Sequence, residues 1–152
     1  MDEAVIDALI LAGALLSGPG TAGTATQAIV HTAATLPKAW RPFADCVAQR
    51  ESHANPRSLN RSSGAAGKWQ FLPSWQHGLP FMVRDRLIAT GMSRKEANRV
   101  RRVLAAAPIN RWREHYQDIG FAAALLAPNG QGWRHWSLPG HPCQGLVPGF
   151  AR

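Results

Sequence analysis

The sequence predicts a mainly helical domain of the α+β class, with a small β or turn element directly after one of the helices. Long and apolar side chains recur at helical spacing before Glu51, at Phe43, Cys46, Val47 and Arg50. Asn55-Pro56 then predicts a helix end, and Ser62-Ser63-Gly64 predicts a turn. A third pattern, amphipathic over residues 94–107, predicts a second well-defined helix.

The N-terminal part of the chain predicts a helical segment and a linker. Residues 4–16 are apolar, but they are too few for a membrane span of about 20 residues and they include Asp7. With no Lys or Arg before this run and no clean cleavage site after it, we expect a helix that packs on the domain or on a partner. Residues 17–26 are rich in Gly, Thr and Ser and predict a linker. Residues 27–36 predict a second short helix, so we divide the chain into segment 1–36 and domain 37–152.

The helix predicted over residues 94–107 has two distinct faces. Ser93 and Glu96 form a capping-box pattern at its start. One face is apolar, with Ala97, Val100, Val103 and Leu104, and the rest is crowded by Arg94, Lys95, Arg99, Arg101 and Arg102. This face could contact nucleic acid, or it could be the solvated face of a basic protein.

Length and composition limit the function classes. The chain has 152 residues, of which 45% are hydrophobic and 17% charged, so it is long enough for one globular domain with its own core. A formal charge of +8 predicts a polyanionic partner. That partner is either nucleic acid or the peptidoglycan and acidic polymers of a bacterial wall, and charge alone leaves both open.

Glu51 is the candidate catalytic residue. A glycosidic oxygen leaves only after an acid protonates it, and a Glu does this near neutral pH if burial raises its pKa above about 4.3. Small residues that allow a ligand near the backbone follow at 64–67, and then come the side chains of Trp69, Gln70, Phe71 and Trp75. These types of residue suit the cleavage of a sugar polymer.

Two motifs carry a resemblance to a known family. The pattern Cys-x-x-x-Arg-Glu-Ser-x-x-Asn-Pro at 46–56, followed by Ser-Ser-Gly-Ala-Ala-Gly-Lys-Trp-Gln-Phe at 62–71, resembles the core of the lysozyme-like transglycosylase superfamily. The resemblance is strongest to the resuscitation-promoting-factor type and to cell-wall hydrolases of actinobacterial phages. Residues 117–136 resemble the later helix of that family. Residues 76–113 are longer than its minimal form needs, which predicts an insertion there.

The resemblance implies a lysozyme-like domain and roles for individual residues. Glu51 matches the catalytic acid and Ser52 its partner, while the segment Gly67 to Phe71 matches part of the glycan cleft. We expect Ser52, Gln70 and the backbone at Gly67 to orient the glycan, with Trp69, Phe71 and Trp75 along the cleft. The bond cleaved would join N-acetylmuramic acid to N-acetylglucosamine in peptidoglycan.

The acidic residues after Glu51 are few, and this favours chemistry with one acid. They are Asp85, Glu96, Glu114 and Asp118, and none stands shortly downstream of Glu51, where a second catalytic carboxylate would be expected. Lytic transglycosylases of the superfamily use one Glu, which first donates a proton and then accepts one from the muramic 6-hydroxyl. Asp118 is the alternative second acid, as an electrostatic partner.

Cys46 and Cys143 have two interpretations. As residues, they could be two buried free thiols, because cysteine often behaves as a small apolar side chain. The resemblance instead implies a disulfide between them, and hence an oxidising destination. The sequence has no Cys-x-x-Cys and no histidine pair with ligand spacing, so we expect neither a metal site nor a cofactor.

The expected partner is therefore bacterial peptidoglycan, with no membrane span and no specific nucleic acid. We expect the protein in a phage virion, where residues 4–16 could contact other virion proteins, or in the extracellular space at a cell wall. The alternative is a non-catalytic basic module, structural or bound to nucleic acid, that uses residues 94–113.

Overall fold

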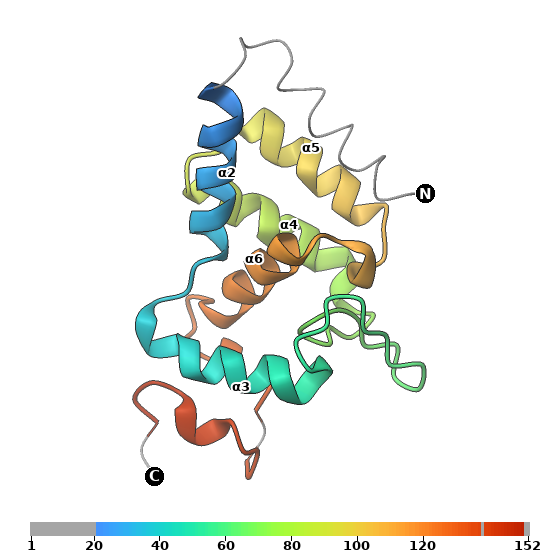
Figure 1. The fold of residues 1–152 in the computed structure, drawn as a ribbon, viewed down its shortest axis with the longest axis vertical. Helices are drawn as coiled ribbons and strands as arrows, with labels where there is room; N and C mark the ends of the chain where they lie inside the picture. Colours follow the sequence, from blue (N-terminus) through green and yellow to red (C-terminus); the bar gives the residue numbers. More distant parts are fainter. Residues whose placement is uncertain (1–20, 138, 151–152) are drawn as a thin grey trace.

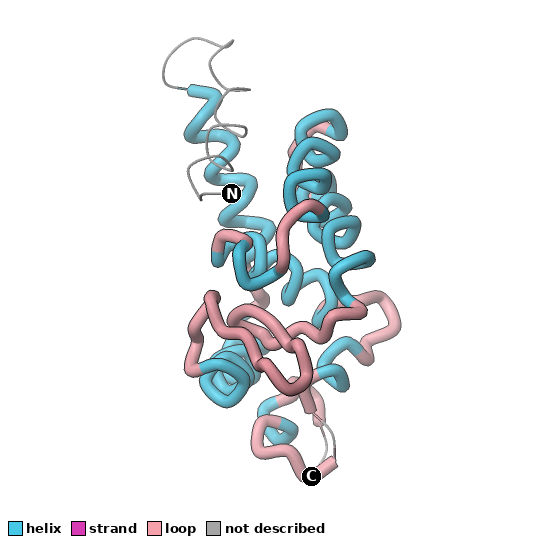
Figure 2. Tube along the Cα trace, turned by 90° about the vertical axis from the view of Figure 1, so that its right-hand side faces the viewer, coloured by secondary structure: helices cyan, strands magenta, loops and turns pink. Residues whose placement is uncertain are grey.

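Helices make up most of the fold, and Figure 2 shows the loops that connect them. The computed structural model describes residues 21–137 and 139–150, and within them no strand forms. This confirms the prediction of a mainly helical fold. The helices are α2 (Thr21–Ala34), α3 (Arg41–Ser52), α4 (Trp75–Ala89), α5 (Arg94–Ala105) and α6 (Glu114–Leu125), with 3-10 turns η1 (Lys38–Trp40), η2 (Ile109–Arg111), η3 (Gly132–His135) and η4 (Gln144–Leu146).

Helix α6 is the centre of the core. Eight of its residues are buried, and they lie on nearly every side of the helix: Tyr116, Gln117, Ile119, Gly120, Phe121, Ala122, Ala124 and Leu125. A helix that is apolar all round is covered by other elements, and α6 packs against α2 and α4. Gly120 permits the close approach of α4, because a Cβ there would lie 3.1 Å from Leu79.

Helix α2 differs from the prediction for the N-terminal segment. The linker predicted over 17–26 is wrong for residues 21–26, which are helical, and the short helix predicted over 27–36 is the second half of α2. Ala33 is fully buried, and the guanidinium of Arg86 donates hydrogen bonds to the carbonyls of Ala33 (2.6 Å) and Thr35 (3.3 Å). The end of α2 is thus part of the same core as residues 37–150. The helix predicted over 4–16 lies outside the described residues.

Helices α4 and α5 form an antiparallel hairpin above α6 (Figure 1). They occupy most of the stretch 76–113 in which an insertion was predicted. Ser93 begins α5 as its cap, since its hydroxyl accepts the N–H of Glu96 (3.2 Å), as the capping-box pattern predicts. Ala97, Val100 and Leu104 bury the apolar face of α5.

Residues 53–74, which we call the turn segment, follow α3 without forming a strand. Two isolated antiparallel bridges join Leu59 to Ala66 and Ala66 to Phe71. The chain reverses direction at Gly64, whose backbone is left-handed (φ 75°). Glycine adopts this conformation readily, which agrees with the turn predicted at 62–64. The β or turn element predicted after the helix that carries Glu51 is therefore a set of turns.

Candidate functional site

Glu51 lies in the last turn of α3, on the side of the helix that faces the core. The buried residues Ala44, Val47 and Ala48 precede it by seven, four and three positions, so all four share one face. Glu51 itself is half-buried. Within the described part of the chain, its carboxyl group makes no hydrogen bond and no ion pair. Of the residues in the predicted spacing, Phe43 and Val47 are buried, Cys46 is partly buried and Arg50 is exposed.

The surroundings of Glu51 favour its neutral form. Burial raises the pKa of its carboxyl above the ordinary value of 4.5, and the charge of Arg50 opposes this shift in part. The carboxyl also lies at the C-terminal end of α3, where the exposed carbonyls carry partial negative charge. A protonated carboxyl with no protein partner is a proton donor that remains free for a ligand.

The chain turns sharply directly after Glu51. His53 (φ 53°) and Ala54 (φ 60°) both adopt left-handed backbone, which costs about 1 kcal/mol or more for each residue with a side chain. The N–H groups of His53 and Ala54 close the helix on Gln49 (3.1 Å) and Ala48 (2.9 Å). The turn is sharp enough to bring the turn segment back beside the end of α3.

Ser52 joins α3 to the predicted cleft segment. Its hydroxyl donates a hydrogen bond to the carbonyl of Lys68 (2.7 Å) and accepts one from the N–H of Asn55 (3.1 Å). The residue is 8% exposed. Ser52 therefore fixes the distance between the helix that carries Glu51 and the segment Gly67 to Phe71, and both of its hydrogen-bonding functions are used within the protein.

Gly67 and Gln70 shape that segment. Gly67 has φ 81°, and a Cβ at this position would clash with the side chain of Gln117. Gln70 also adopts left-handed backbone (φ 49°), and its Nε2 donates to the carbonyl of Gly67 (3.0 Å). No described residue donates a hydrogen bond to its Oε1.

Gln117 is the residue that the sequence analysis missed as part of the site. It is completely buried. Its Oε1 accepts the N–H of Lys68 (2.8 Å), and its Nε2 donates to the carbonyls of Pro56 (3.0 Å) and Trp112 (3.1 Å). One amide thus connects α6, two separate parts of the turn segment and the loop before α6. A Gln in an otherwise apolar helical pattern is the signal that could have identified it.

The aromatic residues of the predicted cleft are largely core residues. Trp69 (5% exposed) stacks on Phe121 with ring centroids 3.6 Å apart, and Phe71 is 2% exposed. Other side chains therefore cover most of these two rings, which were expected along the cleft. Trp75 is only partly buried and meets His135 edge to face (4.9 Å).

Asp118 is already engaged by the protein. Its Oδ1 accepts the indole N–H of Trp69 (2.9 Å) and lies 3.2 Å from Nζ of Lys68, which also pairs with Glu114 (2.8 Å). Burial raises the pKa of Asp118, while Lys68 and Trp69 act to lower it. Asp118 thus supports Trp69 and the turn segment.

Two hollows lie near these residues, and Glu51 lines neither. The larger, about 560 Å³, lies between the turn segment and the loop before α6. The smaller, about 210 Å³, lies beside the first turns of α3 and includes Lys68, Trp69 and Asp118 in its wall.

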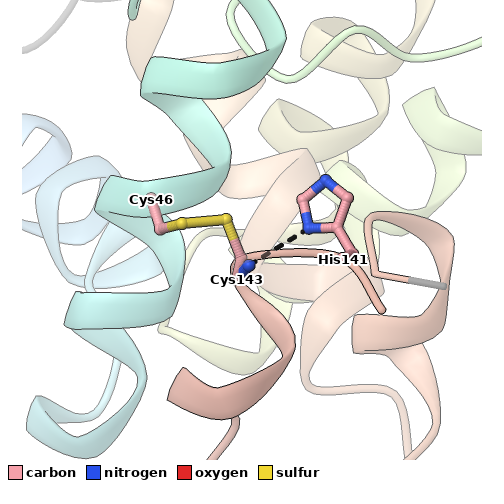
Figure 3. The surroundings of a disulfide bond; sticks show 3 residues. All are labelled: Cys46, His141 and Cys143. Atoms are coloured by element: carbon pink, nitrogen blue, oxygen red, sulfur yellow. Dashed lines mark hydrogen bonds between the residues drawn. A yellow bond between two sulfur atoms is a disulfide. The ribbon is translucent and has the colours of Figure 1, made fainter. Parts of the chain in front are cut away.

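The predicted disulfide is confirmed. Cys46, on the outer flank of α3, is bonded to Cys143 with their Cα atoms 5.7 Å apart (Figure 3). The N–H of Cys143 donates to Nδ1 of His141 (3.2 Å). Burial and the charge of Arg50 lower the pKa of His141, which keeps this nitrogen an acceptor at neutral pH. The bond holds the C-terminal segment against the helix that carries Glu51.

The described residues contain no group of three or more His, Cys, Asp or Glu side chains placed to hold a metal ion. None of the described helices is both long and apolar enough to cross a membrane. Comparisons with known protein families, with curated proteins and with solved structures return no match to this chain.

Proposed function

We propose that this protein is a peptidoglycan-cleaving lytic transglycosylase with a lysozyme-like domain. The observation that carries the proposal is Glu51, a half-buried carboxyl on the core-facing side of α3 with a raised pKa and no hydrogen-bond partner in the described chain. The motifs around it support the substrate class, since they resemble those of wall-cleaving enzymes. Peptidoglycan at a bacterial wall, reached from a phage virion or from the extracellular space, is the proposed target.

The proposed reaction uses one acid. Glu51 donates its proton to the oxygen that leaves between N-acetylmuramic acid and N-acetylglucosamine, as the glycosidic bond breaks. The resulting carboxylate accepts the proton of the muramic 6-hydroxyl, whose oxygen then bonds to the anomeric carbon. No water is consumed, Glu51 ends protonated again, and the product is a 1,6-anhydro sugar. The engagement of Asp118 with Lys68 and Trp69 supports this mechanism over one with two acids.

Mass spectrometry of products from purified peptidoglycan tests the reaction. We expect muramic ends lighter by one water than hydrolysed ends, and we expect Glu51→Gln to lower the rate at least about 100-fold. Asp45→Asn is the matched control, because Asp45 is exposed on the same helix. Reducing ends alone would contradict the one-acid mechanism, and an active Glu51→Gln variant would contradict the site.

The alternative is a non-catalytic basic module, and one observation favours it. The cations of α5 form no ion pair with any described residue, so this face is open to a polyanion. If the wild-type protein releases no fragments from peptidoglycan but binds duplex DNA tightly, this alternative replaces the enzyme.

A further inference from the structure

The solvent-facing side of α5 carries a line of positive charge. Ala97, Val100 and Leu104 are buried on one side of α5. The opposite side, which carries Lys95, Arg99 and Arg102, therefore faces away from the core. These three residues follow each other at intervals of four and three positions, which aligns them along one side of the helix over about 10 Å. Lys95 and Arg102 are exposed, and Arg99 is partly exposed.

No acidic side chain among residues 21–137 and 139–150 forms an ion pair with this line of charge. The ion pairs among the described residues join Lys68 to Glu114 and Asp118, and Arg84 to Asp85, and none involves α5. Glu96 is the single acidic residue of α5, and its Oε2 accepts the hydroxyl of Ser93 (2.5 Å). Like charges three and four positions apart on a helix repel each other. A bound polyanion would relieve that repulsion.

Two arginines lie against the aromatic residue beside this charge. Phe81 of α4 is 43% exposed, and the guanidinium carbons of Arg101 and Arg84 lie 4.7 Å and 5.1 Å from its ring centre. Proteins that bind single-stranded nucleic acid stack bases on open aromatic faces, whereas two guanidinium groups already lie against this ring. The contact also restricts the side chain of Arg101, so this side chain loses less conformational entropy when its N–H groups bind a ligand. These features favour a phosphate chain over stacked bases.

Helix α5 is remote from the proposed catalytic residue. It packs on α4, at the top of the view in Figure 1, whereas α3 lies below α6. A ligand on α5 would therefore leave the end of α3 free for the glycan. The two faces could act on the same wall at the same time.

We propose that Lys95, Arg99 and Arg102, with Arg101 beside them, bind a linear phosphodiester polymer attached to the bacterial wall. The inference rests on the proposed function, which places the protein at a wall. An extended polymer with a phosphate every few ångströms can contact successive cations along the 10 Å line. Binding would retain the enzyme on polymer-bearing walls while Glu51 cleaves the glycan.

The test compares two triple variants of the full chain. In the first, Lys95, Arg99 and Arg102 are replaced by Gln, which keeps the helix propensity of α5. In the control, three exposed cations outside α5, Lys38, Arg61 and Arg134, are replaced by Gln, so the net charge falls by the same amount. Binding to purified poly(glycerol phosphate) and to a duplex oligonucleotide is measured across salt concentrations, and cleavage is measured on polymer-free peptidoglycan.

We expect the α5 variant to bind poly(glycerol phosphate) about ten-fold more weakly or worse, with a salt dependence reduced by about two in log–log slope. The control variant should bind like the wild type, and all three proteins should cleave polymer-free peptidoglycan equally. Equal losses in both variants, no loss in the α5 variant, or tighter binding of the oligonucleotide than of the polymer would each overturn the inference. Failure of the wild type to cleave peptidoglycan would refute the proposed function alone.

Discussion

The turn segment and the α4–α5 hairpin are held in the fold by different kinds of contact. The turn segment depends on a few buried polar groups, chiefly the side chains of Ser52 and Gln117. The hairpin depends on apolar packing, with Leu79, Val83, Val100 and Leu104 in the core. Polar contacts fix a backbone geometry but fail when one atom is removed, whereas apolar packing loses stability gradually. The geometry near Glu51 is therefore the more sensitive of the two.

The largest effect is expected on the side of α3 that carries the disulfide. Replacing Cys46 and Cys143 together with Ala should lower the free energy of unfolding by up to about 4 kcal/mol, because the bond closes a long loop across 97 residues of sequence separation. Urea denaturation measures this loss. Reductant should destabilise the wild type by a similar amount and leave the double variant unchanged. A wild type that is indifferent to reductant would show that the bond does not support the fold.

The next largest effect is expected when the buried hydrogen bonds that hold the turn segment are removed. Gln117→Ala leaves the N–H of Lys68 and the carbonyls of Pro56 and Trp112 without their partner, and we expect a loss of about 3 kcal/mol in unfolding free energy. Hydrogen exchange at the amide of Lys68 should accelerate beyond this global change. Urea denaturation measures the loss of unfolding free energy, and hydrogen exchange measures the local opening at Lys68.

Leu104→Ala on α5 is the matched control for Gln117→Ala. It should cost a similar amount, about 3 kcal/mol, through the cavity that it creates. Under conditions where both variants are folded, we expect Leu104→Ala to keep the peptidoglycan-cleaving rate and Gln117→Ala to lose most of it. Equal activity in the two variants would show that the turn segment does not position the site.

A smaller effect is expected at Ser52. Ser52→Ala removes the hydrogen bond to the buried carbonyl of Lys68, which should cost about 1 to 2 kcal/mol in unfolding free energy. Ser63→Ala is the control, because Ser63 is exposed and accepts one hydrogen bond from Ala65 within its own turn. If both substitutions have the same effect on denaturation, Ser52 is not a tie between α3 and the turn segment.

The smallest effect concerns pH. Because the pKa of Glu51 is raised in the folded state, its neutral form stabilises the fold fully below pH 4.5, and this contribution is lost as pH rises through the folded pKa. Glu51→Gln should therefore raise the melting temperature at pH 7 and leave it unchanged at pH 4. Wild-type cleavage should fall as the pH rises above the pKa of Glu51, since the proton donor is lost. A variant less stable than the wild type at pH 7 would contradict the raised pKa.

The features that sequence reasoning predicted are those encoded locally. The cap at Ser93, the end of α3 before Asn55-Pro56 and the turn at Gly64 each depend on a few neighbouring residues. The position of Glu51 also followed from helical spacing. The disulfide, by contrast, was inferred from the resemblance, since spacing alone allowed two free thiols.

The features that sequence reasoning missed depend on partners remote in the chain. Trp69 was expected to face a ligand, but Phe121 and Asp118, about 50 positions later, cover its ring and bind its N–H. The contacts of Gln117 also span distant segments. Helix α2 begins in a Gly- and Thr-rich stretch, where tertiary packing of its later residues, not intrinsic propensity, stabilises the helix.

The bond between Cys46 and Cys143 turns most of the chain into a covalent ring. The turn segment, the hairpin and α6 all lie between the two cysteines in the sequence. A protease that cuts once at an exposed position such as Arg61 opens this ring without releasing any fragment, because the disulfide still joins the two pieces. A nicked molecule would keep α3 and its C-terminal cover together and would separate into two bands only on a reducing gel. The disulfide therefore keeps the two pieces of the chain joined after a single proteolytic cut between the two cysteines.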